Sequence, residues 1–561
     1  MAKRATNAVE TAETMARRQR EISVSEFFLK NRHLLGFDSP RRALMTAVKE
    51  AVDNSLDACE EAGILPEIAV ELEQTGDNRF RVTITDNGPG IVKAQIPKIF
   101  AKLLYGSKFH RLRMSRGQQG IGISAAGMYG QLTTGSATVI RSRTKGSTAA
   151  HQITVQIDTR QNKPAILSDI SIDWTPAFNG VDENGQPLEP ILYKHGTSVA
   201  IEMEAAYVRG KLSVDEFLKQ CAIVNPHLTL HYEVKLKKPV KGETDGEAPV
   251  ESIRQTFHRG VKKLPPPSIE IMPHPHGVEL GMLMQMLKDT ESRTLRSALA
   301  SDFSRISAQT ALDICEKANV DPKARPDKLP PADIEAVYKT IQQTKLMRPP
   351  TDCLAPIGEE EILAGLKKEI DADFYTSITR DPTVYRGNPF QIEVGIAYAK
   401  PQSDEELNNE NPVRLLRFAN RVPLLYMGGA CAITKAMVGV NWKAYGLTQP
   451  KGALPLGPVV VTVHMASVWV PFTSESKDAI ANYPEIIQEI TLALQECGRR
   501  LSVNISRRKR EAEAERKRGY IEKYIPHLAT GLKDILSLPE KDKTKIESDL
   551  KKMLEKTHLD V

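Results

Sequence analysis

Residues 41–63 constrain the fold of this chain more than any other segment, because they predict a long helix with two chemically different faces. Leu44, Val48 and other apolar residues cover one side, and Gly63 stands where a helix end favours glycine. At about 100° per residue, Glu50, Asn54 and Asp57 fall within about 60° of one another on the other side.

The polar residues of this helix are an unusual choice. Asn and Asp are poor helix formers because they compete for backbone hydrogen bonds, so their presence in mid-helix indicates a further role. A carboxylate that polarises water, beside an amide oxygen that ligates a hard cation, is one such role. A solvated polar face is the alternative for the helix taken alone.

A strand predicted at residues 80–86 runs directly into the sequence TDNGPGI, residues 85–91. Asp86 would end the strand with a carboxylate that can accept a hydrogen bond from an exocyclic amine. Gly88 and Gly90 permit positive φ angles and close approach of a ligand. An ordinary turn remains the alternative.

A third element, residues 115–130, places Gly117, Gly120 and Gly122 before an apolar helical pattern. Free N–H groups at a glycine-rich helix start form a site for anions. The spacing is neither that of a Walker loop nor that of a dinucleotide-binding fingerprint. Later, Thr197 begins a strand, and its hydroxyl could join a hydrogen-bond network or cap a turn.

Charge and cysteine content exclude several classes of protein. The formal charge is +6, but residues 1–20 contribute +3 and residues 503–561 contribute +4, so the remainder carries −1. A polybasic nucleic-acid coat protein is therefore excluded. No two of the six cysteines are closer than 38 residues, so no short zinc motif or disulfide framework is present. Without a signal peptide or an apolar stretch of about 18 residues, we expect a soluble cytoplasmic protein.

The pattern changes along the chain predict several domains. Residues 21–235 alternate helical and β-branched segments, and a helical region follows after a turn-rich stretch. The sequence MRPPTDCLAP, residues 347–356, predicts a linker. The expected divisions are an N-terminal segment at 1–20, an α/β domain at 21–235, a helical domain at 268–345, a second α/β domain at 350–505 that ends in a helix at 483–517, and a basic helical tail at 506–561.

The motifs occur in the order ExxxN on a helix, DxGxG, a glycine-rich lid and GT on a strand, which resembles the Bergerat (GHKL) nucleotide-binding fold. Within that fold, EAVDNSLDACEEAG, TDNGPGI, RGQQGIGISAAGMYGQLTTG and HGTSV are similar to the B subunits of archaeal-type DNA topoisomerase VI, a type IIB enzyme.

The resemblance extends beyond the nucleotide motifs and covers about residues 20–500. Residues 273–283 and 303–315 resemble the helix-two-turn-helix insert of that family, and residues 441–446 and 467–481 resemble its transducer. The resemblance implies a multidomain α/β and α chain. Its parts would be a Bergerat α/β sandwich, a helical insert, a transducer like domain 2 of ribosomal protein S5, and a long C-terminal helix.

The resemblance also implies roles for individual residues. Glu50 would be the general base, Asn54 the Mg²⁺ ligand, and Asp86 the group that reads the adenine amine, while Lys477 would reach the γ-phosphate as a second catalytic residue. The residues implied to bind ATP are Asn54, Asp57, Asp86, Gly88, Gly90, Lys108, Gly117, Gln118, Gln119, Gly120, Ile121, Gly122, Thr197 and Lys477.

The expected partners follow from what the sequence lacks. A type II topoisomerase needs a nucleophilic tyrosine and an acidic metal cluster, and neither can be placed here. Asp371 and Asp373 form a DxD at an apparent helix end without a companion Glu motif, which favours chance spacing. We therefore expect a separate A subunit, held by the helix at 483–517. We also expect dimerisation on ATP binding, a heterotetramer of two A and two B chains, double-stranded DNA as substrate, and a place in the nucleoid rather than a membrane.

Several alternatives stay open on the sequence alone. A MutL-like mismatch-repair ATPase shares the nucleotide fold, a histidine kinase needs an upstream phosphoacceptor helix, and a scaffold would bind ATP without hydrolysis. Trp442, Lys443 and Tyr445 are candidate DNA contacts or core residues. His274 and His276 lack a third metal ligand. Residues 1–20 resemble a strap that crosses to a second protomer, with an unstructured tail as the alternative.

Overall fold

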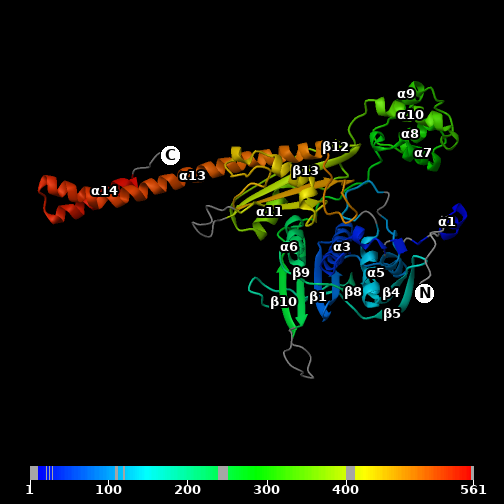
Figure 1. Ribbon diagram of the computed structural model, residues 1–561, viewed down its shortest axis with the longest axis horizontal. Helices are drawn as coiled ribbons and strands as arrows, with labels where there is room; N and C mark the ends of the chain where they lie inside the picture. Colours follow the sequence, from blue (N-terminus) through cyan, green and yellow to red (C-terminus); the bar gives the residue numbers. More distant parts are fainter. Residues whose placement is uncertain are drawn as a thin grey trace, which may run out of the picture.

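The computed structural model describes residues 11–19, 22–23, 26–27, 30–107, 111–117, 120–237, 250–399 and 411–556. Three folded bodies follow one another: an N-terminal α/β domain, a small helical domain, and a second α/β domain from which a helical arm projects (Figure 1). This arrangement confirms the predicted multidomain α/β and α architecture. Of the predicted N-terminal segment, a short helix, α1 (Ala12–Arg18), is described, whereas residues 1–10 and 20 lie outside the described ranges.

An eight-stranded sheet forms the first domain, in the order β10-β9-β1-β2-β8-β3-β4-β5. Neighbouring strands are antiparallel except β1 and β9. The register of β2 against β8 places Thr197 directly opposite Asp86. The strands are β1 (Glu67–Gly76), β2 (Arg79–Asp86), β3 (Thr138–Arg143), β4 (Ala150–Asp158), β5 (Lys163–Ile172), β8 (Gly196–Glu204), β9 (Thr229–Lys237) and β10 (Val250–Phe257), with a separate ribbon of β6 (Ala177–Phe178) and β7 (Ile191–Leu192).

Helices cover this sheet and form the second layer of an α/β sandwich (Figure 1). The predicted helix at 41–63 is α3 (Pro40–Glu61), which starts because Ser39 caps it and Pro40 occupies its first turn. Leu44, Val48 and Leu56 are fully buried in the core, each burial contributing about 1.5–3 kcal/mol. The other helices are α4 (Ile96–Ala101), α5 (Gly122–Thr134) and α6 (Val214–Val224), with 3₁₀ turns η1 (Arg32–Leu35) and η2 (Lys93–Gln95).

The helical domain has an apolar core of its own, which contains Leu287, Leu299, Ile314 and Val337. It is built from α7 (Leu280–Asp289), α8 (Leu295–Ser301), α9 (Ala308–Ala318) and α10 (Pro331–Gln343), with 3₁₀ turns η3 (Pro275–Gly277) and η4 (Pro326–Lys328).

The proline-rich segment after α10 has neither helix nor strand, as expected of a linker, but it is not a solvated one. Cys353 and Leu354 are buried, and the carbonyl of Cys353 accepts a hydrogen bond from Met114 N at 2.9 Å. The linker therefore packs against the first domain.

A six-stranded sheet forms the second α/β domain, with β11, β13, β16, β14 and β15 in order and β12 paired with β13. Central strand β16 lies between β13 and β14 and all its residues are buried, which explains its nearly continuous apolar sequence. The elements are β11 (Ala372–Thr379), β12 (Thr383–Tyr385), β13 (Asn388–Ala399), β14 (Arg414–Ala419), β15 (Val422–Pro423), β16 (Val459–Ser467), α11 (Glu359–Glu369), α12 (Ala432–Gly439), η6 (Gly428–Ala430) and η7 (Trp442–Tyr445).

The C-terminal helix is longer than the sequence predicted. Helix α13 (Pro484–Leu536) has 53 residues and crosses the expected boundary at 505–506, because the charged run at 506–518 consists of good helix formers. Its first half packs on the second sheet through Ile490 and Leu494. The remainder projects as an arm, and α14 (Glu540–Lys556) folds back against it (Figure 1).

The two α/β domains share a small core, which fixes their relative position. Ile223 and Val224 of α6 pack with Leu366 of α11 and Phe418 of β14. A Cβ at Gly365 would lie 1.9 Å from the carbonyl oxygen of Ile223, so the two helices approach closely. The two α/β domains therefore meet at α6 and α11.

Candidate functional site

A cavity of about 600 Å³ lies between the helical layer of the first domain and residues 475–478 of the second. The predicted site residues that line it are Glu50, Asn54, Asp86, Gly90, Gly117, Gly120, Ile121, Gly122, Thr197 and Lys477. They come from α3, the sheet, the glycine-rich segment and the second domain, so the fold brings together motifs that are far apart in the sequence.

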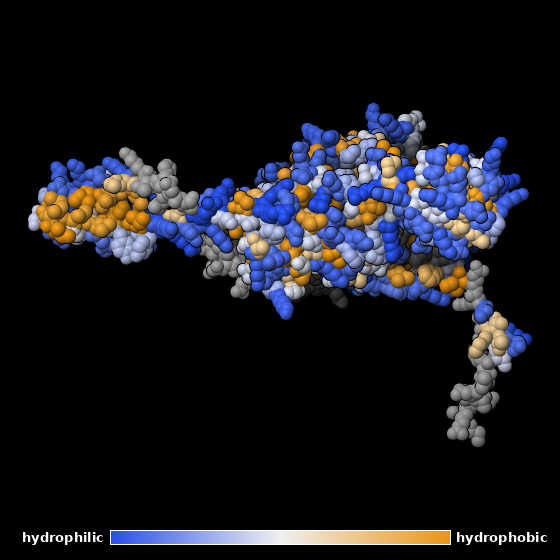
Figure 2. Space-filling view, turned by 90° about the horizontal axis from the view of Figure 1, so that it is seen from above, coloured by the Kyte–Doolittle hydropathy of each residue, from blue (hydrophilic) through white to orange (hydrophobic). Residues whose placement is uncertain are grey.

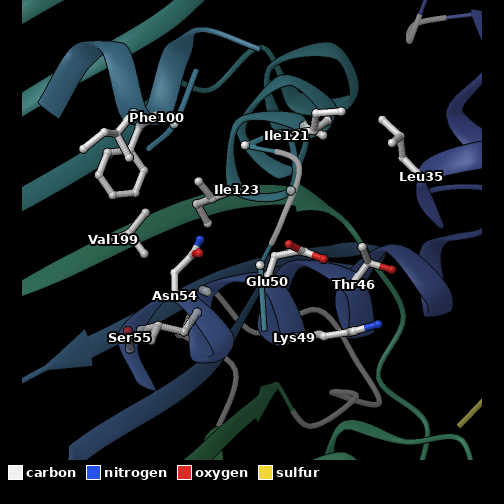
Figure 3. A pocket seen from close by; sticks show the side chains of 18 of the residues that line it. Leu35, Thr46, Lys49, Glu50, Asn54, Ser55, Phe100, Ile121, Ile123 and Val199 are labelled. Atoms are coloured by element: carbon white, nitrogen blue, oxygen red, sulfur yellow. The ribbon is translucent and has the colours of Figure 1, made fainter. Parts of the chain in front are cut away.

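Glu50 and Asn54 project from α3 toward Ile121 and Ile123 at the start of α5 (Figure 3). Glu50 is half-buried and Asn54 is exposed, whereas the apolar side of α3 is buried against the sheet. The helical spacing therefore orients a carboxylate and an amide, one turn apart, into the same cavity.

Helix α5 begins at the glycine-rich segment and directs its first turn at Glu50. A Cβ at Gly122 would lie only 1.8 Å from Glu50 Oε2, so no larger residue fits there while Glu50 keeps its place. Gly120 has φ +57°, a conformation that glycine adopts without strain. The free N–H groups of this first turn make the cavity attractive to an anion.

Asp86 ends β2 and is buried beneath the cavity. Oδ2 accepts a hydrogen bond from Ser55 Oγ at 2.9 Å, and Oδ1 accepts from the N–H groups of Gly88 at 2.9 Å and Thr197 at 3.2 Å. Burial raises the pKa of Asp86 to about 6 although these hydrogen bonds lower it. Gly90, with φ +77°, would clash through a Cβ with the carbonyl of Arg143 at 2.2 Å.

Lys477 reaches the cavity from the loop before α13 and is buried, with a φ of +55°. Its Nζ donates to the carbonyl of Arg116 at 3.2 Å. The same loop is held on α3, because Lys49 Nζ donates to the carbonyl of Ser476 at 3.1 Å and Arg42 forms an ion pair with Asp478. A left-handed backbone at a buried lysine is uncommon and marks a constrained side chain.

Some predicted nucleotide-binding residues lie elsewhere. Asp57 is one helical turn beyond Asn54 and does not line the cavity, because its carboxylate pairs with Arg116 Nη1 at 2.9 Å. Gly88 also lies outside the lining and donates its N–H to Asp86. Lys108, Gln118 and Gln119 fall outside the described residues.

Comparison with known proteins decides the family. Residues 40–161 match the family described as "Histidine kinase-, DNA gyrase B-, and HSP90-like ATPase", and residues 349–517 match "Topoisomerase VI B subunit, transducer". The B subunit of type 2 DNA topoisomerase 6 from Methanococcoides burtonii is 48% identical over 94% of this chain and 79% of its own length. The proteins of the same name from Methanosarcina acetivorans and Archaeoglobus fulgidus are 48% and 42% identical, over 95% and 97% of this chain and 79% and 84% of their own lengths.

The chain belongs to the family of type 2 DNA topoisomerase 6 B subunits. It combines a nucleotide-binding ATPase domain with a transducer domain, as the ATPase subunit of a type IIB DNA topoisomerase. Membership of this family implies an A subunit and DNA as partners. The family excludes the MutL-like and histidine-kinase alternatives.

Trp442 of this topoisomerase chain, a candidate DNA contact or core residue on the sequence alone, is a core residue in this structure. Its indole is fully buried in the transducer core and donates from Nε1 to the carbonyl of Met437 at 2.8 Å. The ring of Tyr445 makes an edge-to-face contact with the indole of Trp442 and lies against Gly498 of α13. Lys443 is exposed. Core packing accounts for both rings of this motif.

Other polar groups have structural partners. Asp373 pairs with Arg508 at 2.9 Å, and the Nε2 atoms of His274 and His276 lie within hydrogen-bond distance of backbone carbonyls. Among the described residues, no group of three or more His, Cys, Asp or Glu side chains is arranged to hold a metal ion. Within the same ranges, no helix has the length and apolar content needed to cross a bilayer.

Sequence reasoning missed the charged residues that join the two domains of the topoisomerase chain. Arg42, Lys49, Arg116 and Arg421 all lie at this junction. A weak signal was present, because Lys49, Asp53 and Glu60 fall on one side of α3 at helical spacing, next to the face that carries Glu50 and Asp57.

Proposed function

We propose that the cavity binds ATP with Mg²⁺ and hydrolyses it. The observation that carries this proposal is that Glu50, Asn54, Asp86 and Lys477 line one cavity. Asp86 would accept a hydrogen bond from the adenine amine, supported by Thr197, and the segment from Gly117 to Gly122 would donate N–H groups to the phosphates.

The hydrolytic step would use Glu50 as general base. Glu50 would take a proton from a water molecule whose oxygen attacks the γ-phosphorus, and ADP would leave as inorganic phosphate forms. The amide oxygen of Asn54 fits a Mg²⁺ site completed by phosphate oxygens, because Mg²⁺ prefers oxygen ligands and few protein groups. Bound Mg²⁺ would neutralise charge on the phosphates.

Lys477 would couple this reaction to movement between domains. It belongs to the transducer but lines the cavity of the ATPase domain, so its ammonium group could pair with the γ-phosphate. Cleavage of that phosphate would remove the contact and release the loop that carries Lys477.

The DNA reaction would require a larger assembly. Two copies would dimerise on binding ATP, aided by residues 1–20 as a strap, and two A subunits would supply the tyrosines that break one duplex. A second duplex would pass through the break, which relaxes supercoils and separates linked circles. Lys443 is the exposed member of the suggested DNA contact and remains a candidate.

The end of the arm is a candidate surface for the A subunit. Figure 2 shows an apolar patch over the tip of α13 and α14. Its exposed residues are Tyr520, Ile521, Tyr524, Leu528, Leu532, Ile535, Leu536 and Met553. A continuous apolar surface of this kind is typical of an interface with another protein.

The proposal is tested by ATP turnover and plasmid relaxation. The chain alone should hydrolyse ATP slowly and relax no supercoiled plasmid, whereas addition of the A subunit should give relaxation that depends on ATP and Mg²⁺. Glu50→Gln should retain ATP binding and dimerisation but reduce turnover by about 100-fold or more. Glu61→Gln, near the end of the same helix, is the matched control.

Two results would count against the proposal. Relaxation by the chain without the A subunit would remove the need for a partner that cleaves DNA. Normal strand passage by Glu50→Gln would instead favour a scaffold that binds ATP without needing to hydrolyse it.

A further inference from the structure

A buried cluster of charges joins the ATPase domain to the transducer, and Arg116 lies at its centre. Arg116 immediately precedes Gly117 of the glycine-rich segment and is only 5% exposed. Burial of a guanidinium is costly unless its donors are paired, so the arrangement of its partners indicates what the residue does.

The guanidinium of Arg116 is held mainly by α3. Nη1 donates to Asp57 Oδ1 at 2.9 Å and to Glu60 Oε2 at 2.8 Å, while Nη2 donates to Glu60 Oε1 at 2.7 Å and to Asn225 Oδ1 at 2.6 Å. Burial alone would raise the pKa of Glu60, but Arg116 and His227 hold this pKa well below its usual value. Glu60 therefore stays ionised and forms a bidentate pair that fixes the guanidinium plane.

The carbonyl of the same residue holds Lys477. Lys477 Nζ donates to Arg116 O at 3.2 Å, inside the wall of the nucleotide cavity. The side chain of Arg116 thus anchors the peptide whose oxygen orients the lysine. A shift of that peptide would move the ammonium group relative to the cavity.

The transducer also contacts the segment around Arg116, through Asn420 and Arg421. Asn420 Nδ2 donates to the carbonyl of Ser115 at 2.9 Å, and Arg421 Nη1 lies 3.9 Å from Glu60 Oε1. The N–H group of Arg421 donates to His464 Nε2 at 2.9 Å, and His464 Nδ1 lies 2.7 Å from the buried Glu393. Arg116 is therefore fixed relative to both domains that must move together.

We propose that Arg116 is a positioning residue for ATP hydrolysis, and that its ion pairs with Asp57 and Glu60 fix the carbonyl that sets where Lys477 meets the terminal phosphate. This inference rests on the proposed role of Lys477. Arg116 itself does not line the cavity, so it acts through the lysine and not by touching the nucleotide.

The test compares Arg116→Lys with Arg259→Lys in the full chain, alone and with the A subunit. Lysine keeps the positive charge but cannot form the bidentate pair. Arg259 is a matched control, since its Nη2 donates at 2.6 Å to the buried Glu67 and it does not line the nucleotide cavity. Arg116→Lys should reduce kcat for ATP about tenfold with a change in KM below twofold, whereas Arg259→Lys should leave both unchanged.

A double-mutant cycle with Lys477→Met separates positioning from loss of stability. If Arg116 acts through Lys477, Arg116→Lys should cause no further loss of kcat in the Lys477→Met background. Equal losses in both backgrounds, or an unchanged kcat in Arg116→Lys, would overturn the inference. Normal turnover of Lys477→Met alone would instead refute the proposed role of the lysine.

A milder variant covers the case in which Arg116→Lys fails to fold. Asp57→Asn removes one partner of the guanidinium but leaves the bidentate pair with Glu60 in place. It should lower kcat several-fold, and this loss should also vanish in the Lys477→Met background. A loss that persists there would overturn the inference equally.

Discussion

Asp53 offers a direct test of the electrostatics at the domain junction. It lies on α3 between the functional face and the transducer, is 4% exposed, and its Oδ1 has no hydrogen-bond partner among the described residues. Burial raises its pKa to about 7, and the opposing attraction of Lys49, Arg116 and Lys477 does not offset this effect. Below about pH 7 the folded protein therefore favours the protonated carboxyl.

Asp53 makes the free energy of unfolding depend on pH, because its pKa differs between the folded and unfolded states. Between the unperturbed pKa of 3.8 and the folded value of about 7, the folded state binds a proton that the unfolded chain releases. The free energy of unfolding therefore falls as pH rises through this window. The pKa of Asp53 differs by about three units between the folded and unfolded states. Relative to a pH below both pKa values, the free energy of unfolding is therefore lower by about 4 kcal/mol at pH 8 and by roughly 1.5 kcal/mol at pH 5.

Asp53→Asn replaces the protonated carboxyl by a neutral group of the same shape and should remove this loss. We expect the variant to exceed the wild type by up to about 4 kcal/mol at pH 8, with a smaller advantage at pH 5. For a domain of about 200 residues, such as the N-terminal α/β domain that contains Asp53, the shift in Tm at pH 8 would be on the order of 10 °C. Thermal unfolding from pH 5 to pH 8 measures both quantities.

Asp57, one turn further along α3, provides the matched control. Its carboxylate is paired with Arg116, so Asp57→Asn should destabilise the protein by about 2–3 kcal/mol instead of stabilising it. The reasoning fails if Asp53→Asn gives no gain at pH 8, or if its gain is the same at pH 5 and pH 8.

Three further substitutions test separate parts of the site. Gly122→Ala should displace Glu50, because the added Cβ would meet its carboxylate. ATP turnover should fall by about 100-fold and nucleotide binding by less. Equal losses of turnover and of nucleotide affinity would contradict this account. Asp86→Asn replaces a charged hydrogen-bond acceptor beneath the cavity by a neutral one. ATP binding measured by calorimetry should weaken by about 3 kcal/mol. An unchanged affinity would show that Asp86 does not bind the adenine. Glu393→Gln weakens a buried hydrogen bond between the Glu393 carboxylate and His464, whose pKa burial lowers. It should lower the stability of the transducer by about 1.5–3 kcal/mol in thermal unfolding, and an unchanged transition would show that this hydrogen bond is not stabilising.

The elements with strong local patterns could be predicted from the sequence. The periodicity of α3 and the β-branched residues of β2 each agree with the structure to within a few residues. The order of the nucleotide motifs indicated the nucleotide-binding fold, and the sequences of these motifs, of the insert and of the transducer indicated the family. The helix and strand patterns, and each motif taken singly, depend only on neighbouring residues in the chain.

The junction between the domains could not be predicted in the same way. The contact of Lys477 with Arg116 joins residues 361 positions apart, and no helical or strand period connects them. For Trp442 the sequence left DNA contact and core packing open, because burial of the ring depends on strands and helices that are distant in the chain. Asp57 likewise shares the helical face of Glu50, but its carboxylate pairs with Arg116 and does not line the cavity.

The length of α13 has a mechanical consequence. Ile505 is the last residue of this helix in the transducer core, so the 31 residues from there to Leu536 extend about 45 Å at 1.5 Å per residue. A rotation of the transducer by about 10° would then carry the far end through about 8 Å, provided the helix stays straight. The proposed loss of a phosphate contact by Lys477 would produce such a displacement only through a stiff arm. Helix α14 packs against α13 and doubles the cross-section of the arm where it is furthest from the transducer.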